Sequence, residues 1–174
     1  MALIKSIRGF TPEFGKDCYL ADNATIIGDV VMGDQCSVWF NAVVRGDVHY
    51  IRIGNKVNIQ DGAIIHCTYK TAPTTIGNNV SIAHKAIVHG CTIEDNVLIG
   101  MNAIVMDNAR IGKNSIIAAG AVVLENTVVE PGSVYAGIPA KKIKDISEEL
   151  TSDLLERISN NYVKYASWYN DESP

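Results

Sequence analysis

An aliphatic residue returns at every sixth position through most of this chain, and few sequence features constrain a fold more tightly. A small or β-branched residue follows most of these anchor residues by four positions. The anchors are Leu20, Ile26, Met32, Val38, Val44, Ile53, Ile59, Ile65, Ile76, Ile82, Val88, Ile93, Ile99, Val105, Ile111, Ile117, Val123 and Val129. A short fixed period of this kind is typical of a parallel β-solenoid, in which the repeating residues fill the interior.

The hexad pattern resembles that of the left-handed parallel β-helix, a triangular prism in which each side of a coil holds one hexad. The handedness rests on this resemblance and not on the spacing. After Ser147, which can cap a helix, apolar residues recur at helical spacing. The predicted fold class is an all-β solenoid, a left-handed parallel β-helix of hexapeptide repeats with a C-terminal α-helix. Its predicted parts are a lead-in over residues 1–19, the solenoid over 20–140 and a helix packed on it over 147–169.

The composition of the chain limits the binding partners and the cellular compartment that we expect for it. The 15 basic and 19 acidic residues give a net charge of −4, which disfavours nucleic acid or an anionic membrane as a partner. No apolar run is long enough to span a membrane, and the N-terminus lacks the apolar stretch of a signal peptide. The four cysteines have no CxxC spacing and are expected to be reduced. We therefore expect a cytoplasmic protein with no nucleic-acid or membrane partner.

Three of the four histidines occupy related places in the repeat. His66 and His89 each directly follow an anchor on the same side of the prism, as Arg45 does one coil earlier, so the three form one outward column. Successive members lie about 4.8 Å apart, the spacing of paired strands. Asp61 and His84 form a second column, two positions after the anchors of the preceding side. Two breaks in the period add residues beside these columns, and insertions in a solenoid go outward as loops.

This register predicts a metal site shared between chains. His66 and His89 can bind one ion together, whereas His84 points outward from a different side of the prism. A Zn–N bond of about 2.0–2.1 Å leaves no slack for a third ligand so placed. A rotational oligomer resolves this, because His84 of one chain can face His66 and His89 of the next. Three imidazoles with an open fourth position are typical of a catalytic zinc site; the alternative is three surface histidines on a polar strip.

Several runs of residues resemble the γ-class carbonic anhydrases, in particular their short bacterial relatives. The resemblance covers nearly the whole chain, and the histidine spacing is its most specific part. The closing run is weaker evidence, since hexapeptide acyltransferases share it. Besides His66, the matching runs are Asn41–Asp47, Asn58–Asp61, Ile82–His84, Val88–Gly90 and Tyr135–Lys141.

The resemblance implies a homotrimer with metal sites at its subunit boundaries. His66, His84 and His89 would bind zinc, or else iron or cobalt as Fe²⁺ or Co²⁺, with His84 supplied by the neighbouring chain. The implied reaction is the reversible hydration of carbon dioxide to bicarbonate by hydroxide on the metal.

Further roles follow from the same resemblance. Arg45 would pair with Asp61 across the boundary and help to hold bicarbonate, although a purely structural bridge is an equal alternative. Gln60 would hydrogen-bond water on the metal, with support from nearby polar residues. Those implied supporting residues are Asp47, Asn58 and, from the C-terminal helix, Tyr162.

One departure from the family pattern concerns proton transfer. The type member of the family has an acidic loop that relays protons, whereas Val48 follows Asp47 here and the loop over residues 69–75 has no carboxylate. Either turnover is low, or His49 or Tyr162 carries the proton. Two other functions stay open: a hexapeptide acyltransferase or acyl-CoA thioesterase, and a non-catalytic bicarbonate-binding homologue.

Overall fold

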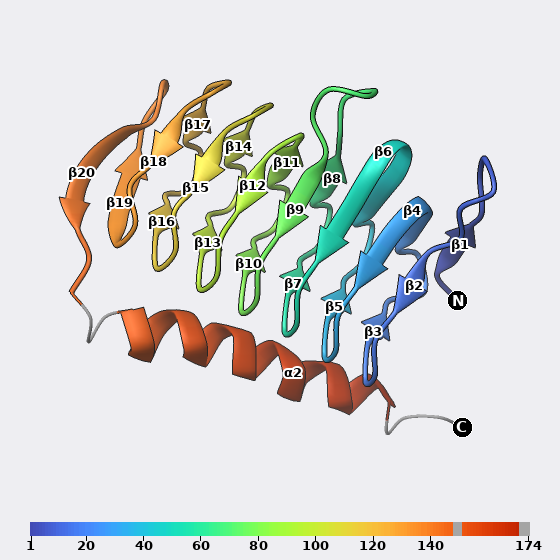
Figure 1. Cartoon of the computed structure of the whole chain (residues 1–174). Helices are drawn as coiled ribbons and strands as arrows, with labels where there is room; N and C mark the ends of the chain where they lie inside the picture. The colour runs from blue at the N-terminus through green and yellow to red at the C-terminus, as the bar shows by residue number, and fades with distance from the viewer. Residues whose placement is uncertain (148–150, 171–174) are drawn as a thin grey trace.

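The structure, a computed structural model, describes residues 1–147 and 151–170 and shows a parallel β-solenoid of about seven turns with one C-terminal helix (Figure 1). Its strands pair in parallel from coil to coil along the prism, apart from the last strand (Lys141–Asp145), which pairs antiparallel with the strand before it. The fold class predicted from the six-residue period is therefore confirmed.

The strands lie on three sides of the prism. The histidine side consists of β1 (Leu3–Lys5), β8 (Ile64–His66), β11 (Ile87–His89), β14 (Ile104–Val105) and β17 (Val122–Val123). The helix side consists of β3 (Tyr19–Leu20), β5 (Ser37–Val38), β7 (Asn58–Ile59), β10 (Ser81–Ile82), β13 (Leu98–Ile99), β16 (Ile116–Ile117), β19 (Ser133–Ala136) and β20 (Lys141–Asp145). The third side consists of β2 (Glu13–Phe14), β9 (Thr74–Ile76), β12 (Thr92–Ile93), β15 (Arg110–Ile111) and β18 (Val128–Val129).

Two longer strands join the histidine side to the third side. They are β4 (Thr25–Met32) and β6 (Val43–Ile53), and each pairs with strands of both sides. Residues Val43 and Val44 of β6 pair with β8, whereas its residues from Ile51 onward pair with β9. The three residues added between the Val44 and Ile53 anchors therefore extend this strand around a corner beside the histidines.

The anchors and the small residues between them form the core. Anchors such as Ile59, Ile65 and Ile99 have no exposed surface, and neither do small residues such as Ala63 and Ala103. Many corners of the prism require a left-handed backbone, and asparagine tolerates this conformation better than most residues. Positive φ angles are found at corner asparagines that include Asn79, Asn96, Asn102, Asn108, Asn114 and Asn126. The hexad period thus defines both the interior and the corners.

Strand pairing begins before the first anchor. β1 and β2, within the stretch expected to be a lead-in, pair in parallel register with β4. Backbone pairing does not require the hexad motif, so the repeat pattern alone underestimates how far the sheets extend. These two strands cover an edge that β4 would otherwise expose.

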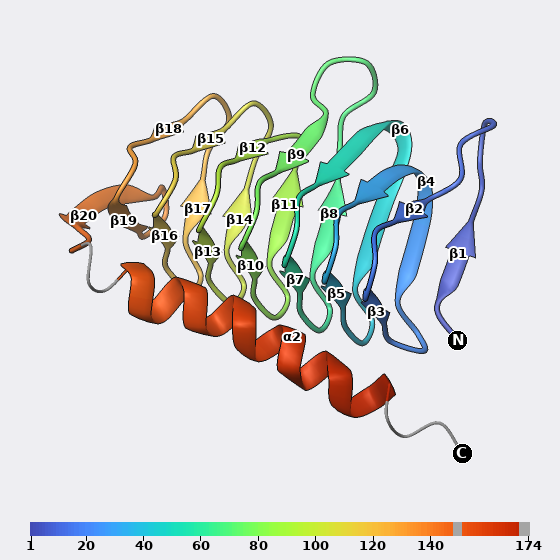
Figure 2. The same ribbon diagram turned by 60° about the horizontal axis from the view of Figure 1, so that its bottom comes forward.

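The C-terminal helix runs along the solenoid against the helix side (Figure 2). It consists of a π-helical turn, η1 (Thr151–Glu156), followed by α2 (Arg157–Asn170). Leu155 and Ala166 are buried, and α2 contacts β3 and β5. The start of the predicted helix, residues 148–150, lies outside the described residues. No helix among the residues that the structure describes is long and apolar enough to cross a membrane.

Candidate metal site

His66 and His89 lie side by side on the histidine side, as the register predicts. They are direct partners in the pairing of β8 with β11. Nδ1 of His66 lies 3.1 Å from Nε2 of His89. Two ligands on a tetrahedral zinc ion with bonds of about 2.0–2.1 Å are separated by roughly 3.3 Å. The two imidazoles therefore fit a single divalent ion between them.

A carboxylate holds the other ring nitrogen of each of these histidines. Asp47 Oδ1 lies 3.1 Å from His66 Nε2, and Asp107 Oδ1 lies 2.5 Å from His89 Nδ1. Carboxylates placed in this way fix the tautomer and the orientation of an imidazole that binds a metal. This arrangement holds each ring in one orientation, which a histidine without such a partner does not have.

Sequence reasoning missed Asp107, which comes from the turn after β14, one coil beyond His89. Its second oxygen accepts a 2.5 Å hydrogen bond from Thr68 Oγ1, in the loop between β8 and β9. A Cβ on Gly90 would lie only 2.4 Å from Asp107 Oδ1, so the absence of a side chain at Gly90 makes room for the carboxylate. The sequence signal that could have identified this contact is the register of the repeat, which places the acidic Asp107 directly over Gly90 of the preceding coil.

His84 lies apart from the other two histidines, at the edge of the helix side after β10. Its Nδ1 is 2.9 Å from Asp61 Oδ2, so it too has a carboxylate behind one ring nitrogen. Among the described residues, no group of three histidine, cysteine or acidic side chains within one chain could hold a metal ion. A single chain therefore brings two of the three predicted ligands together and leaves the third on another side.

Arg45 pairs with Asp47 within the chain. Its Nη1 lies 2.6 Å from Asp47 Oδ2, so Asp47 bridges Arg45 and His66. Burial alone would raise the pKa of Asp47, but hydrogen bonds from Arg45 and His66 lower it below its ordinary value. Burial lowers the pKa of His66, which favours the neutral imidazole that a metal requires. Asp47 is thus an anion that orients a neutral His66.

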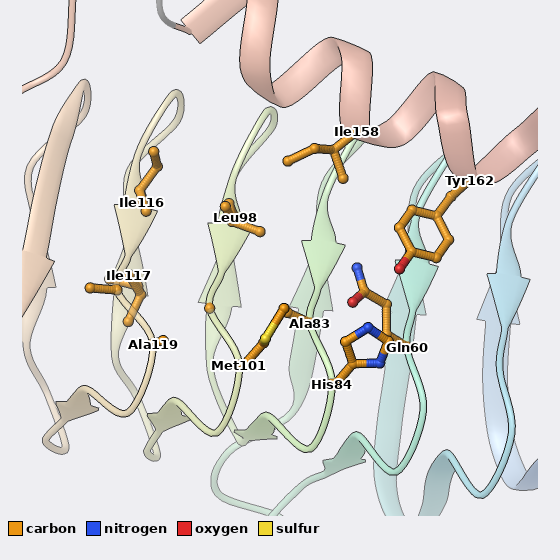
Figure 3. A pocket seen from close by; sticks show the side chains of 12 residues that line it. Gln60, Ala83, His84, Leu98, Met101, Ile116, Ile117, Ala119, Ile158 and Tyr162 are labelled. Atoms are coloured by element: carbon orange, nitrogen blue, oxygen red, sulfur yellow. The ribbon is translucent and has the colours of Figure 1, made fainter.

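Asn58 and Gln60, which the sequence predicts to support the site, are held by hydrogen bonds on the helix side. Asn58 Nδ2 donates to Ser81 Oγ at 2.8 Å, and Gln60 Nε2 donates to Asn58 Oδ1 at 2.9 Å. Figure 3 shows Gln60, His84 and Tyr162 gathered at one end of a pocket. Burial, together with the negative charge of Asp61, raises the pKa of Tyr162 to about 12, so its phenol stays protonated at neutral pH.

Cysteine does not offer a fourth ligand to the histidine pair. Cys67 and Cys91 follow His66 and His89 at short range, but both are buried in the core. Burial raises the pKa of Cys91 to about 12 and also raises that of Cys67, which disfavours the thiolate that binds metals. All four cysteines are free, in agreement with the sequence expectation. The donor set therefore consists of imidazoles backed by carboxylates.

The fold and the paired histidines define a hexapeptide-repeat solenoid protein with a candidate site for a divalent metal. Family models for the bacterial transferase hexapeptide (six repeats) and the hexapeptide repeat of succinyl-transferase match residues 90–125 and 73–106. The chain is 55% identical over 150 residues to a protein named "Probable carbonic anhydrase" from Methanocaldococcus jannaschii, covering 86% of this chain and 91% of the relative. It is 49% identical over 164 residues to gamma carbonic anhydrase 3, mitochondrial, from Arabidopsis thaliana, covering 90% of this chain and 61% of the relative. The chain therefore belongs to the γ-class carbonic anhydrase family of hexapeptide-repeat proteins.

A solved structure agrees with this assignment of the fold. The structure of a candidate acetyltransferase from Bacillus cereus superposes with a TM-score of 0.94 at 35% sequence identity, covering 99% of each chain. The same solenoid with its C-terminal helix thus occurs in a protein described by a different activity. Function has to be argued from the site rather than from the fold.

Proposed function

We propose that this protein catalyses the reversible hydration of carbon dioxide to bicarbonate at a divalent metal site. The observation that carries the proposal is the His66–His89 pair, with two ring nitrogens 3.1 Å apart and a carboxylate on the far side of each ring. Relatives named as carbonic anhydrases, at 42–55% identity, support the same reaction.

The donor set favours zinc, with Fe²⁺ or Co²⁺ as alternatives that imidazoles also bind. An ion of this kind, when bound with an open position, lowers the pKa of water from about 15.7 to near 7 and so supplies hydroxide at neutral pH. The remaining tasks belong to the protein. Asp47 and Asp107 orient the two imidazoles, and the low pKa of each carboxylate keeps it anionic for that purpose.

We propose a homotrimer in which His84 of the neighbouring chain completes the site. Its Nδ1 is held by Asp61, which leaves Nε2 as the nitrogen for a ligand bond. A contact between two different faces of the same chain closes a ring when the rotation permits it. In that assembly Arg45 would also lie beside the column of the neighbouring chain that contains Asp61 and His84.

Arg45 is suited to hold bicarbonate. Its side chain is 40% exposed, and only Nη1 is committed to Asp47, so other guanidinium N–H groups can donate to a planar anion. Gln60 is buried, and its amide is fixed by Asn58, which gives it one orientation at the edge of the site. Together they would bind and orient the substrate atoms while the histidines hold the ion.

Removal of the proton is expected to limit the rate. The phenol of Tyr162, with a pKa of about 12, is a hydrogen-bond donor rather than a shuttle at neutral pH. His49, which the sequence offers as the other carrier, lines a small pocket with Asp47. We therefore expect turnover to depend strongly on external buffer, which can accept the proton directly.

The decisive experiment combines metal analysis with stopped-flow hydration of carbon dioxide under reducing conditions. We expect one metal ion per chain in the trimer and a hydration rate that disappears on chelation and returns with zinc. A metal-loaded trimer with no hydration activity would instead support a non-catalytic bicarbonate-binding protein. We place the protein in the cytoplasm, an expectation supported by its four free cysteines.

The family models described by transferases support one competing function, an acyltransferase or acyl-CoA thioesterase. Such an enzyme would bind coenzyme A and would retain activity after chelation. Equilibrium binding of coenzyme A to the metal-free protein separates the two proposals.

A further inference from the structure

Cys18 and Cys36 occupy the same position in successive coils, at the corner between the third side and the helix side. Strand β3 pairs in parallel with β5, in a register that aligns the residues directly after the two cysteines. The backbone N–H of Tyr19 donates to the carbonyl of Cys36 at 2.9 Å. Before the pair, the N–H of Gln35 donates to the carbonyl of Lys16 at 2.8 Å. Backbone hydrogen bonds on both sides therefore hold the two cysteines next to each other.

The spacing of the coils suits a disulfide between these cysteines. Paired strands lie about 4.8 Å apart, and the Cα atoms of a disulfide lie roughly 4.4–6.8 Å apart. The sulfur of Cys18 already points toward the coil that contains Cys36, because it donates to the carbonyl of Gly33 in that coil at 3.2 Å. Rotation of the side chains can therefore bring the two sulfurs together while the backbone stays in place.

The two thiols differ in reactivity. Cys18 is only partly buried, and a hydrogen bond from the Cys36 thiol lowers the pKa of Cys18 to about 7, against the opposing effects of burial and of Asp34. Cys36 is buried, and the same hydrogen bond together with burial raises its pKa. Because the thiolate is the form that reacts with oxidants, Cys18 is suited to be the nucleophile. Cys36 remains a thiol beside it.

The other two cysteines lack this combination. Cys67 and Cys91 are buried, and burial raises the pKa of each thiol. The register of the strands places Cys67 beside Gly90 and Cys91 beside Thr74, so neither is aligned with a second cysteine. Among the four cysteines, the reactive thiol and its aligned partner are thus confined to one corner.

We infer that Cys18 and Cys36 form a reversible oxidation site, at which a hydroperoxide converts Cys18 to a sulfenic acid and Cys36 then closes a disulfide. The inference goes beyond the proposed function and does not depend on it, since no step involves the metal or its ligands. In a reducing compartment such a disulfide is transient and reports exposure to an oxidant. Its formation joins the first coil to the second by a covalent bond.

Both steps balance with hydrogen peroxide as the oxidant. The Cys18 thiolate attacks one peroxide oxygen, so an S–O bond forms, the O–O bond breaks, and the departing hydroxide takes a proton from the solvent. The sulfur of Cys36 then attacks the sulfur of Cys18 and releases its proton. An S–S bond forms, the S–O bond breaks, and the hydroxide leaves as water with that proton. Two electrons pass from the sulfurs to the peroxide.

Thiol titration of the purified full chain tests the site. After treatment with a small excess of hydrogen peroxide, the thiols titrated in denaturant should fall from four to two per chain. Peptide mapping should show Cys18 linked to Cys36, and the intact mass should fall by two hydrogen atoms. Dithiothreitol should restore all four thiols, because it reduces a disulfide but not the higher oxides of sulfur.

Three serine variants assign the roles. Cys18→Ser keeps a donor for the Gly33 carbonyl and should lose thiols about tenfold more slowly than the wild type, because the reactive thiolate is gone. Cys36→Ser should oxidise at Cys18 without forming a disulfide, and dimedone should trap the sulfenic acid there. Cys67→Ser is the matched control. It keeps a donor for the His49 carbonyl and should lose two thiols as fast as the wild type.

The outcomes are distinct from those of the proposed function. A wild-type chain that keeps all four thiols overturns the inference, and so does a disulfide that includes Cys67 or Cys91. Equal rates of thiol loss in Cys18→Ser and the wild type overturn it as well. A protein that binds no zinc or hydrates no carbon dioxide contradicts the proposed function alone, because the thiol titration requires neither.

Discussion

The coils up to Gly90 and the coils after it share one backbone plan but differ in what they present outward. In the histidine-side column, the earlier coils place Arg45, His66 and His89, and the later coils place Met106 and Leu124 in the same register. The interior is equally buried in both regions. Stability and chemistry therefore occupy different positions of the same hexad, so either can change while the other is kept.

The largest expected effect comes from the earlier coils. His89→Ala should remove zinc and lower the hydration rate by more than 100-fold, because only one ligand of the pair remains. Met106→Ala, the next residue in the same column, should keep one zinc per chain and the wild-type rate. Metal analysis and stopped-flow measurements check both variants. Equal zinc content in the two variants would contradict the assignment of the site to the earlier coils.

Asp107 crosses the boundary between the two regions, since it reaches from a later coil to His89. Asp107→Asn should weaken zinc affinity by about 10–100-fold through a less constrained imidazole. The control is Glu125→Gln, in the equivalent position one coil later, where no histidine lies opposite. Competition with a chromophoric chelator measures both affinities. Unchanged zinc affinity in Asp107→Asn would show that Asp107 does not help His89 to bind the metal.

The two regions also differ at their corners. Lys85 adopts a left-handed backbone with φ of 59°, whereas the equivalent corner one coil later is Asn102 with φ of 56°. Because this conformation suits asparagine better, Lys85→Asn should stabilise the fold by about 0.5–1 kcal/mol and Asn102→Lys should destabilise it similarly. Urea unfolding at a fixed protein concentration measures the change. Destabilisation in both variants would show that contacts of the side chains outweigh backbone strain.

What could be predicted from the sequence follows from the same division. The period places Ile65 and Val88 in register, and with them His66 and His89, because each histidine directly follows its anchor. Asp107 was missed because its role depends on the empty space over Gly90 in the coil before it. The strands before Leu20 lack the repeat altogether. The pocket shown in Figure 3 depends on the path of the C-terminal helix, which no hexad position specifies.

The smallest expected changes in the free energy of unfolding concern two ion pairs, Arg45–Asp47 in the earlier coils and Glu94–Arg110 in the later coils. Glu94 in the later coils accepts hydrogen bonds from Arg110 and from the backbone N–H of Lys113, and these interactions lower the pKa of Glu94. Arg110 is largely exposed and Glu94 is partly exposed, so Glu94→Gln should destabilise the fold by only about 0.5 kcal/mol. Because the pKa is lower in the folded state, this stabilisation is present above the unfolded pKa of about 4.3 and disappears as the pH falls through the folded value.

Arg45→Gln, in contrast to Glu94→Gln, should affect the hydration reaction more than the stability of the fold. Loss of its pairing with Asp47 should lower the hydration rate and raise KM for bicarbonate, while the free energy of unfolding changes by less than about 1 kcal/mol. Urea unfolding at pH 7 and pH 4, together with stopped-flow kinetics, measures both variants. If Glu94→Gln slowed hydration as much as Arg45→Gln, the division between the two regions would fail, because a remote surface charge would then influence the site as strongly as a residue in its column.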